Sequence, residues 1–365
     1  MSAPSETAVL AALQAVVNPD TGQDFVSSKA LKNLRIASNG DVSFDIEFGY
    51  PARSRQAGLR KALTAAVRAV PGVGEVDIDF STRIVAHAVQ RGVQLLPGVK
   101  NIVAIASGKG GVGKSTTAAN LALALAAEGA KVGVLDADIY GPSQPMMLGL
   151  SGRPESADGK SMDPMENYGL QVMSIGFLIE QDQAMIWRGP MATQALEQLL
   201  RQTNWRDLDY LLVDMPPGTG DIALTLSQRV PLTGEVIVTT PQDIALIDAK
   251  KGLKMFEKVG VPILGIVENM AMFCCPNCGH QEAIFGQGGG QAMATQYGVD
   301  YLGALPLAMA IREQADSGRP TVVAAPESPE AQIYRDVARA VALKIAAQSR
   351  DYSAKFPSIT ISSGT

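Results

Sequence analysis

The residues best suited to chemistry lie in a glycine-rich segment, residues 107–117, which reads Ser-Gly-Lys-Gly-Gly-Val-Gly-Lys-Ser-Thr-Thr. Gly108, Gly113, Lys114 and Ser115 fit the pattern G-x-x-x-x-G-K-[ST]. The glycines let the backbone turn tightly and point several N–H groups at one anion. Lys114 is therefore expected to reach the outer phosphates of a nucleotide, and the Ser115 hydroxyl is expected to bind magnesium.

The surroundings of this segment favour a nucleotide site over a chance match to the pattern. An apolar run at residues 102–106 predicts a buried strand before the loop, and strong helix formers at residues 118–127 follow it. A helix that starts at the loop adds the positive end of its dipole to a phosphate site. The residues expected to bind the nucleotide are Gly108, Lys109, Gly110, Gly111, Val112, Gly113, Lys114, Ser115 and Thr116.

Two further apolar runs end in acidic residues. Residues 131–136 end in Asp136, and Asp138 follows two positions later. Paired carboxylates near a phosphate site suit magnesium–water binding and the positioning of an attacking water. Residues 208–214 form another apolar strand that ends in Asp214, which is expected to hold magnesium directly or through water. For Asp136, a helix cap or a turn is the competing interpretation.

All three cysteines lie close together, at positions 274, 275 and 278. Cys275 and Cys278 form a C-x-x-C knuckle, and such soft thiolates select iron–sulfur clusters, zinc or copper(I). A cubane cluster generally needs four cysteines, so two protomers across a two-fold axis would supply a complete set. Zinc bound with the help of Cys274 and His280 stays open, as does a redox dithiol. The clustering also favours a reducing compartment.

The composition limits the partners of the chain. A formal charge of −5 over 365 residues gives no broad attraction for nucleic acid or for anionic membranes. No apolar run reaches the roughly 18 residues that a membrane span needs. Residues 1–7 contain no basic residue of the kind that opens a signal peptide. We therefore expect a cytoplasmic protein that binds neither nucleic acid nor membranes.

Sequence patterning divides the chain into four parts. Residues 1–80 predict a small α+β domain with a helix, a hairpin around Asn39-Gly40, a second helix and a last strand. Residues 81–98 are expected to be a linker. Residues 99–348 form the main domain, and residues 349–365 are expected to be a disordered tail.

In the main domain, apolar strands alternate with helices, which predicts a mostly parallel sheet with helices on both faces. The expected strands are 102–106, 131–136, 170–175, 208–214, 235–240, 263–268 and 301–304. The fold class is therefore α/β, a P-loop NTPase domain with a small N-terminal α+β domain. Ligands of such sheets bind at the carboxyl ends of the strands, where the glycine-rich segment and the acids are placed.

The glycine-rich segment carries an additional lysine, Lys109, directly after its first glycine. With this lysine it resembles the deviant Walker A group of P-loop proteins, whose members are ATPases that work as dimers. The resemblance implies that Lys109 reaches the nucleotide of a partner subunit and is catalytic together with Lys114. It also implies that Asp138 orients the attacking water, with Asp136 in support. Asn269 resembles the adenine-recognising asparagine of that group, because its amide offers a donor and an acceptor. A simple turn asparagine is the alternative.

Five motifs occur in one order along the chain. They are residues 108–115 (Gly-Lys-Gly-Gly-Val-Gly-Lys-Ser), 138–143 (Asp-Ile-Tyr-Gly-Pro-Ser), 187–191 (Trp-Arg-Gly-Pro-Met), 214–221 (Asp-Met-Pro-Pro-Gly-Thr-Gly-Asp) and 275–278 (Cys-Pro-Asn-Cys). Together they resemble the Mrp/ApbC family of iron–sulfur cluster carrier ATPases over residues 99–345. The N-terminal domain more weakly resembles a MIP18-like domain. The motif at 187–191 has no chemistry of its own and is either an interface or switch-facing loop or a packing turn.

Family membership implies a homodimer that carries a [4Fe–4S] cluster between its subunits, bound by Cys275 and Cys278 of each. ATP and Mg²⁺ are the implied cofactors, a cluster assembly scaffold is a possible donor, and apo iron–sulfur proteins are the recipients. A partitioning-type ATPase switch with a structural zinc knuckle is the alternative function. A reductase related to the nitrogenase iron protein is a third, although its cysteines normally come from two separated positions.

Overall fold

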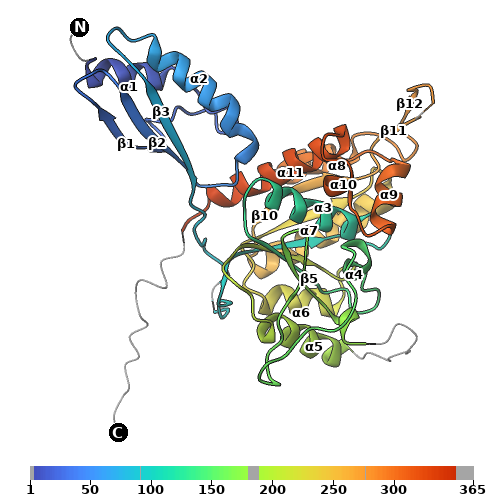
Figure 1. Ribbon diagram of the computed structural model, residues 1–365. Coiled ribbons are helices and arrows are strands. Elements are labelled where there is room, and N and C mark those ends of the chain that lie inside the picture. Colours follow the sequence, from blue (N-terminus) through green and yellow to red (C-terminus); the bar gives the residue numbers. More distant parts are fainter. Residues whose placement is uncertain (1–3, 91, 180–188, 276, 351–365) are drawn as a thin grey trace.

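A small three-stranded sheet forms near the N-terminus and stands to one side of a larger sheet (Figure 1). The computed structural model describes residues 4–90, 92–179, 189–275 and 277–350. The small domain contains α1 (Glu6–Gln14), β1 (Leu31–Ile36), β2 (Val42–Phe48), the 3-10 turn η1 (Arg53–Arg55), α2 (Gln56–Arg68) and β3 (Val76–Thr82). Strand β2 lies in the middle, antiparallel to β1 and parallel to β3.

Alternating hydrophobicity explains how the small sheet packs. Val42, Phe44, Ile46 and Phe48 of β2 are buried, while the residues between them are only partly buried. Helix α2 places a buried stripe of leucine and valine against this apolar face. The helix, hairpin, helix and strand predicted from the sequence are present in that order.

The main sheet has eight strands in the order β13-β10-β9-β4-β8-β5-β7-β6. Its strands are β4 (Val99–Ala106), β5 (Val132–Asp136), β6 (Met165–Asn167), β7 (Leu170–Ser174), β8 (Leu208–Asp214), β9 (Gly234–Thr239), β10 (Ile263–Glu268) and β13 (Tyr301–Ala304). Each is parallel to its neighbours except β6, which pairs antiparallel with β7 at the edge. A short separate hairpin consists of β11 (Phe273–Cys274) and β12 (Gln281–Glu282).

Helices cover both faces of this sheet, as the alternating pattern predicts. They are α3 (Lys114–Ala127), α4 (Gln144–Met147), α5 (Gly189–Gln202), α6 (Asp221–Arg229), α7 (Asp243–Val259), α8 (Gly289–Tyr297), α9 (Met309–Asp316), α10 (Thr321–Ala324) and α11 (Pro329–Ala346), with the 3-10 turn η2 (Ile175–Phe177). Helices α3, α10 and α11 pack together, while α5, α6, α7 and α8 form a second continuous layer. None of the helices in the described ranges has the length and apolar composition that a bilayer span requires.

The seven strands predicted for the main domain are all present, and the first begins earlier, at Val99. Three short strands, β6, β11 and β12, were not predicted. Each has only two or three residues, so none carries a periodic pattern. The interiors of β4, β5 and β8 are buried throughout, which explains why these central strands could be recognised.

Candidate functional site

The glycine-rich loop joins the buried strand β4 to α3 at the carboxyl edge of the sheet. Two contacts fix its backbone: the Ser107 hydroxyl donates to the Lys109 carbonyl at 2.9 Å, and the Gly218 N–H donates to the Ser107 carbonyl at 2.9 Å. The second contact places the loop after β8 directly against the phosphate loop. The loop at 214–221 is therefore in direct contact with the backbone that would cradle a phosphate.

Two glycines of the loop are required by neighbouring side chains and helices. Gly113 has φ of 82°, and a Cβ there would lie 2.1 Å from Nδ2 of Asn269. A Cβ on Gly108 would lie 2.1 Å from the backbone carbonyl carbon of Asp248 in α7. The loop is thus packed between the end of β10 and α7, and a side chain at either glycine would displace it.

Lys114 and Asp214 form a buried ion pair. The side chains are 6% and 0% exposed, and the lysine ammonium also lies 3.2 Å from the Ser115 hydroxyl oxygen. The second carboxylate oxygen of Asp214 accepts a hydrogen bond from Nε2 of Gln144 at 2.8 Å. The residues predicted to bind phosphate and magnesium therefore lie together around one cation.

Asp136 lies beside Asp214, because the two are register partners in β5 and β8. Its carboxylate accepts hydrogen bonds from the Gln144 N–H and the Ser174 hydroxyl, both at 3.1 Å, and from the Asp138 N–H at 3.2 Å. Burial, reinforced by the charge of Asp214, raises the pKa of Asp136 to about 7. Asp136 is thus an anchor for the loop that carries Asp138.

Asp138 is the half-buried acid of this loop. Burial raises its pKa above the ordinary value for an aspartate, while the Lys114 charge opposes the shift. Its position just after β5 brings it to the same edge as the phosphate loop. Lys109 lies in the loop itself, and within the described ranges no carboxylate is within ion-pair distance of its ammonium.

Gln144 is a site residue that the sequence patterning missed. It is fully buried and its side-chain amide donates to the Ser115 carbonyl at 3.0 Å as well as to Asp214. The only available signal was its place next to Pro145, just past the motif at 138–143. Gln144 ties the acid loop, the magnesium-site candidate and the start of α3 into one network.

Asn269 follows β10 and is held against the phosphate loop. Its Nδ2 donates to the Val112 carbonyl at 2.9 Å, and its backbone N–H donates to the Thr239 carbonyl at 2.7 Å. The amide group therefore supports the loop, and its role toward an adenine stays a prediction.

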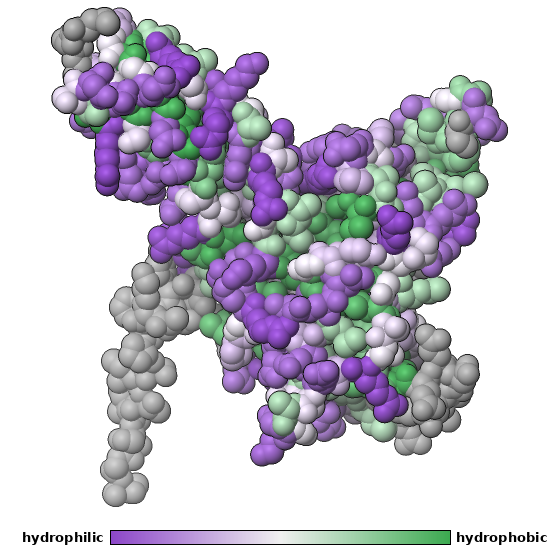
Figure 2. Space-filling model, viewed as in Figure 1, coloured by the Kyte–Doolittle hydropathy of each residue, from purple (hydrophilic) through white to green (hydrophobic). Residues whose placement is uncertain are grey.

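The cysteines lie on the β11–β12 hairpin, which projects from the body of the main domain (Figure 1). Cys274 and Cys278 are exposed, and Cys275 is half-buried. The hairpin is anchored to the end of β13, where the Leu307 N–H donates to the Met272 carbonyl at 2.9 Å. Figure 2 shows apolar as well as polar surface along this projecting arm.

The knuckle favours thiolate chemistry but does not enclose a metal by itself. Backbone N–H groups of Asn277 and then Cys278 lower the pKa of the Cys275 thiol, which favours the ligand form. The residues described contain no group of three or more His, Cys, Asp or Glu side chains arranged to hold a metal ion. His280, the extra ligand considered for a zinc site, therefore does not complete a preformed site within one chain.

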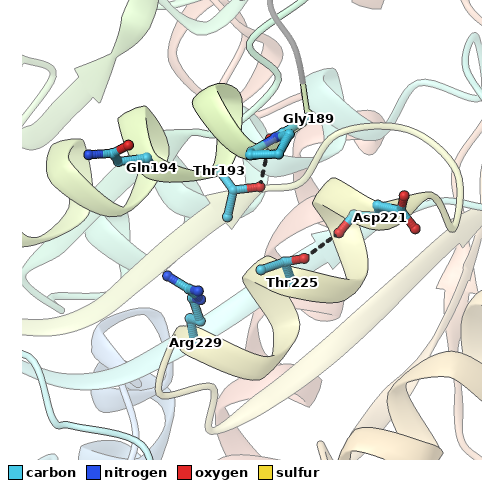
Figure 3. A pocket seen from close by; sticks show the side chains of 7 residues that line it. Gly189, Thr193, Gln194, Asp221, Thr225 and Arg229 are labelled. Atoms are coloured by element: carbon cyan, nitrogen blue, oxygen red, sulfur yellow. Dashed lines mark hydrogen bonds between the residues drawn. The ribbon is translucent and has the colours of Figure 1, made fainter.

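The motif at 187–191 falls partly outside the described residues, which resume at Gly189. Gly189 begins α5, and with Pro190 it lines a pocket of about 410 Å³ between α5 and α6 (Figure 3). Asp221, at the end of the loop at 214–221, lines the other side. The hydroxyls of Thr193 and Thr225 bond to carbonyls of their own helices. The described part of the motif, Gly189 and Pro190, thus faces α6, the helix that follows the loop at 214–221.

Comparison with known proteins assigns both parts of the chain. The profile of the NUBPL iron-transfer P-loop NTPases matches residues 98–342, and the profile of iron–sulfur cluster assembly proteins matches residues 6–78. An iron–sulfur cluster carrier protein of Pseudomonas fragi is 59% identical, covering 76% of this chain and 97% of the relative. One from Haemophilus influenzae is 47% identical over 94% of this chain and 93% of its own length.

A eukaryotic relative and two solved structures extend the comparison. The iron–sulfur cluster transfer protein NUBPL of Mus musculus is 52% identical over 68% of this chain and 79% of its own length. A nucleotide-binding protein of Archaeoglobus fulgidus, solved with ADP, is 38% identical with a TM-score of 0.56, covering 64% of this chain and 91% of that one. The cell division ATPase MinD of Pyrococcus furiosus is 25% identical with a TM-score of 0.50, covering 66% and 98%.

Proposed function

The chain belongs to the NUBPL iron-transfer P-loop NTPases, the iron–sulfur cluster carriers, and from this premise we propose three finer properties. It hydrolyses ATP with Mg²⁺, it holds a [4Fe–4S] cluster between two copies of itself, and it passes that cluster to apo-proteins. The observation that carries the proposal is the placement of two sites at one edge of the sheet. The nucleotide loop follows β4, and the exposed C-x-x-C hairpin follows β10, two strands away.

The nucleotide site is supported by the ion pair between Lys114 and Asp214. When a triphosphate enters, Lys114 can turn from the carboxylate to the phosphate oxygens without leaving the loop. Ser115 and Asp214 would then hold Mg²⁺, whose chemistry is to neutralise charge on the phosphates. The buried carboxylates and the Ser115 hydroxyl fit that ion, because hard cations prefer oxygen ligands.

Hydrolysis needs a positioned water and further positive charge more than covalent chemistry. Asp138 is our candidate for orienting the water, since it is half-buried near Lys114 and its loop is fixed by Asp136. Its raised pKa is compatible with accepting a proton from that water. Lys109, which has no ion-pair partner among the described carboxylates, is the candidate for stabilising phosphate charge across the dimer.

A homodimer is supported by the surface around this edge. Large apolar side chains that are more than half exposed follow the carboxyl ends of β5, β9, β10 and β13. They are Tyr140, Met146, Ile244, Ile247, Ile284 and Met309. Apolar residues gathered at one end of a sheet mark an interaction surface, and burial against a second copy would remove them from water.

The number of cysteines in the knuckle also supports a second copy, because each chain supplies only half of the four that a cubane cluster takes. Cys275 and Cys278 are accessible, and a cubane cluster takes four thiolates, which two hairpins related by a two-fold axis would provide. The cluster is cargo in this scheme, so an exposed hairpin suits its release. Movement of the loop at 214–221 on nucleotide binding would rearrange the dimer interface and hence change the affinity of the dimer for the cluster.

The cysteine chemistry also supports a compartment and partners for the carrier. Free, accessible thiols persist in reducing compartments, so we place the protein in the cytoplasm. An assembly scaffold is the proposed donor of the cluster, and apo iron–sulfur proteins are the proposed recipients.

The test is anaerobic reconstitution with iron and sulfide, followed by transfer to an apo-ferredoxin. The double variant Cys275→Ala, Cys278→Ala should take up no stable cluster while keeping wild-type ATP hydrolysis. Cys274→Ala is the matched control, because it removes a thiol from the same hairpin without touching the knuckle. A double variant that still loaded and transferred a full cluster would overturn the assignment, and stoichiometric zinc without sulfide would favour the partitioning-type switch.

A further inference from the structure

The N-terminal domain is bonded to the far end of the helix that carries the nucleotide loop. Glu128 caps the C-terminus of α3. The Arg53 N–H donates to the Glu128 carbonyl at 3.2 Å, and the Ser54 N–H donates to Oε2 of Glu128 at 2.9 Å. The turn η1 of the N-terminal domain thus donates one hydrogen bond to the backbone carbonyl and one to the side chain of the residue that ends α3.

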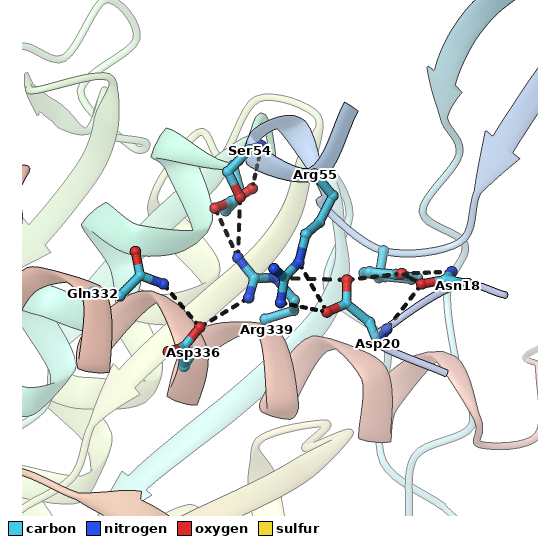
Figure 4. A network of polar contacts seen from close by, with 9 residues as sticks. Asn18, Asp20, Ser54, Arg55, Gln332, Asp336 and Arg339 are labelled. Atoms are coloured by element: carbon cyan, nitrogen blue, oxygen red, sulfur yellow. Dashed lines mark hydrogen bonds and ion pairs between the residues drawn. The ribbon is translucent and has the colours of Figure 1, made fainter. Parts of the chain in front are cut away.

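Arg339 of α11 joins the two domains at the same point (Figure 4). One of its terminal nitrogens lies 3.2 Å from Oε1 of Glu128 and 3.1 Å from the Ser54 hydroxyl. The other terminal nitrogen donates to Asp336 of its own helix at 3.0 Å. Arg339 therefore bridges α11, α3 and the N-terminal domain.

A second acidic residue faces Arg339 from the N-terminal domain. Asp20 is itself held by Arg55, at 2.8 Å, and by the Tyr50 hydroxyl at 3.2 Å. Its carboxylate lies 3.8 Å from Nε of Arg339, which is buried and makes no hydrogen bond. A shift of about 0.8 Å would bring these atoms to hydrogen-bond distance. The contact of Asp20 and Ser54 with Glu128 and Arg339, here called the joint, can therefore tighten or loosen with a small movement.

The charges at this joint are removed from water only while the domains are docked. The side chains of Glu128, Arg339 and Asp20 are 3%, 4% and 5% exposed. Removing one charged member of such a network leaves the opposite charge buried and unpaired, which is strongly unfavourable. Docking of the N-terminal domain and the position of the end of α3 are therefore energetically linked.

Helix α3 connects this joint to the nucleotide site as one rigid element. Its 14 residues begin at Lys114 of the phosphate loop and end against Glu128, a distance of about 21 Å along the axis. Asn120 fixes its middle, because its side-chain oxygen accepts from the Val322 N–H of α10 at 3.0 Å. A displacement at the loop thus reaches the joint without an intervening flexible segment.

We propose that Glu128 and Arg339 are positioning residues that couple the N-terminal domain to the nucleotide loop through α3. Nucleotide binding changes how tightly the N-terminal domain is docked. A partner that prefers one docking state therefore binds with a different affinity when nucleotide is present, and that partner changes the nucleotide affinity by the same factor. The inference rests on the nucleotide-binding part of the proposed function and is independent of the cluster.

The experiment is amide hydrogen exchange of the full-length protein, with and without Mg²⁺ and the non-hydrolysable analogue AMPPNP. The reporters are the N–H groups of Arg53 and Ser54, which bond to Glu128. We expect the analogue to change their exchange rates at least about fivefold. In Arg339→Gln this response should disappear while AMPPNP still binds. Arg312→Gln, at an exposed arginine of α9 that pairs with Glu313 and Asp316, is the matched control and should respond like the wild type.

The outcomes separate the two proposals. If AMPPNP binds and exchange at residues 53–54 does not respond, the coupling is refuted and the nucleotide site stands. If AMPPNP does not bind the wild type, the proposed function fails and the coupling fails with it. Should Arg339→Gln not fold, Glu128→Gln makes the same comparison, because it keeps the size of the side chain and removes the charge that faces Arg339. A wild-type response in Glu128→Gln as well as in the control would also refute the coupling.

Discussion

Replacing Lys114 with methionine should destabilise the nucleotide-free protein, in addition to weakening nucleotide binding. Lys114 pairs with Asp214, and both side chains are buried. Asp136 occupies the neighbouring register position, and burial together with the Asp214 charge raises its pKa to about 7. Methionine keeps most of the length of lysine but removes the cation that these two carboxylates share.

The size of the effect follows from the burial of the pair. Removing one partner of a buried ion pair typically costs about 3–5 kcal/mol, because the other charge is left uncompensated. For a domain of this size each kcal/mol shifts the unfolding midpoint by about 2–4 °C, which gives a loss of about 6–20 °C.

The loss should be greater at pH 8 than at pH 6. Without the cation, the folded-state pKa of Asp136, which is already about 7, moves further above the unfolded value of about 3.9. Between the unfolded and folded pKa values, the folded state holds protons that the unfolded state has released. Stability therefore falls as the pH rises through this window.

Thermal unfolding of Lys114→Met at pH 6 and pH 8, without nucleotide, checks this reasoning. The matched control is Lys114→Met combined with Asp214→Asn, which removes the orphaned charge and should recover most of the loss. A single variant that unfolds at the wild-type midpoint at pH 8 would show that Lys114 does not neutralise buried carboxylates in the nucleotide-free protein.

Three further changes test other parts of the molecule. Lys109→Ala should keep nucleotide binding but lose at least about tenfold in phosphate release, since its charge acts in the transition state; normal hydrolysis would break the link between the loop and a dimer. Gln144→Leu leaves an oxygen of Asp214 without a donor and should cost about 1–3 kcal/mol in chemical unfolding, whereas an unchanged midpoint would contradict the network. Glu235 is buried with both carboxylate oxygens unpartnered, and burial raises its pKa well above the usual value. The stability of the wild type should therefore fall as the pH rises above the ordinary pKa of a glutamate, and that of Glu235→Gln should fall less; parallel profiles would argue against it.

The central fold could be predicted because its determinants are local. Strands β4, β5 and β8 are short buried runs that each lead into a motif, and parallel pairing then brings Asp136 beside Asp214. The chemistry of the loop at 107–117 needs only contiguous residues. These features can be predicted from a sequence because they depend only on the types and spacing of neighbouring residues.

Other parts of the site depend on contacts that no local pattern records. Gln144 has no periodicity around it, and its partners lie 29 and 70 positions away. Glu128 directly follows α3 and Arg339 lies in α11, and they meet across 211 positions of the chain. Gly108 was expected to serve a phosphate, but the close approach of α7 also requires it. Such pairings emerge only when the layers pack.

The most direct test of the central claim is native mass spectrometry of the anaerobically reconstituted protein, combined with iron and sulfide analysis. Our account predicts one [4Fe–4S] cluster for every two chains, held by Cys275 and Cys278 of each, and loss of that species in the double alanine variant. A full cluster on a single chain, or a dimer containing zinc and no sulfide, would contradict it.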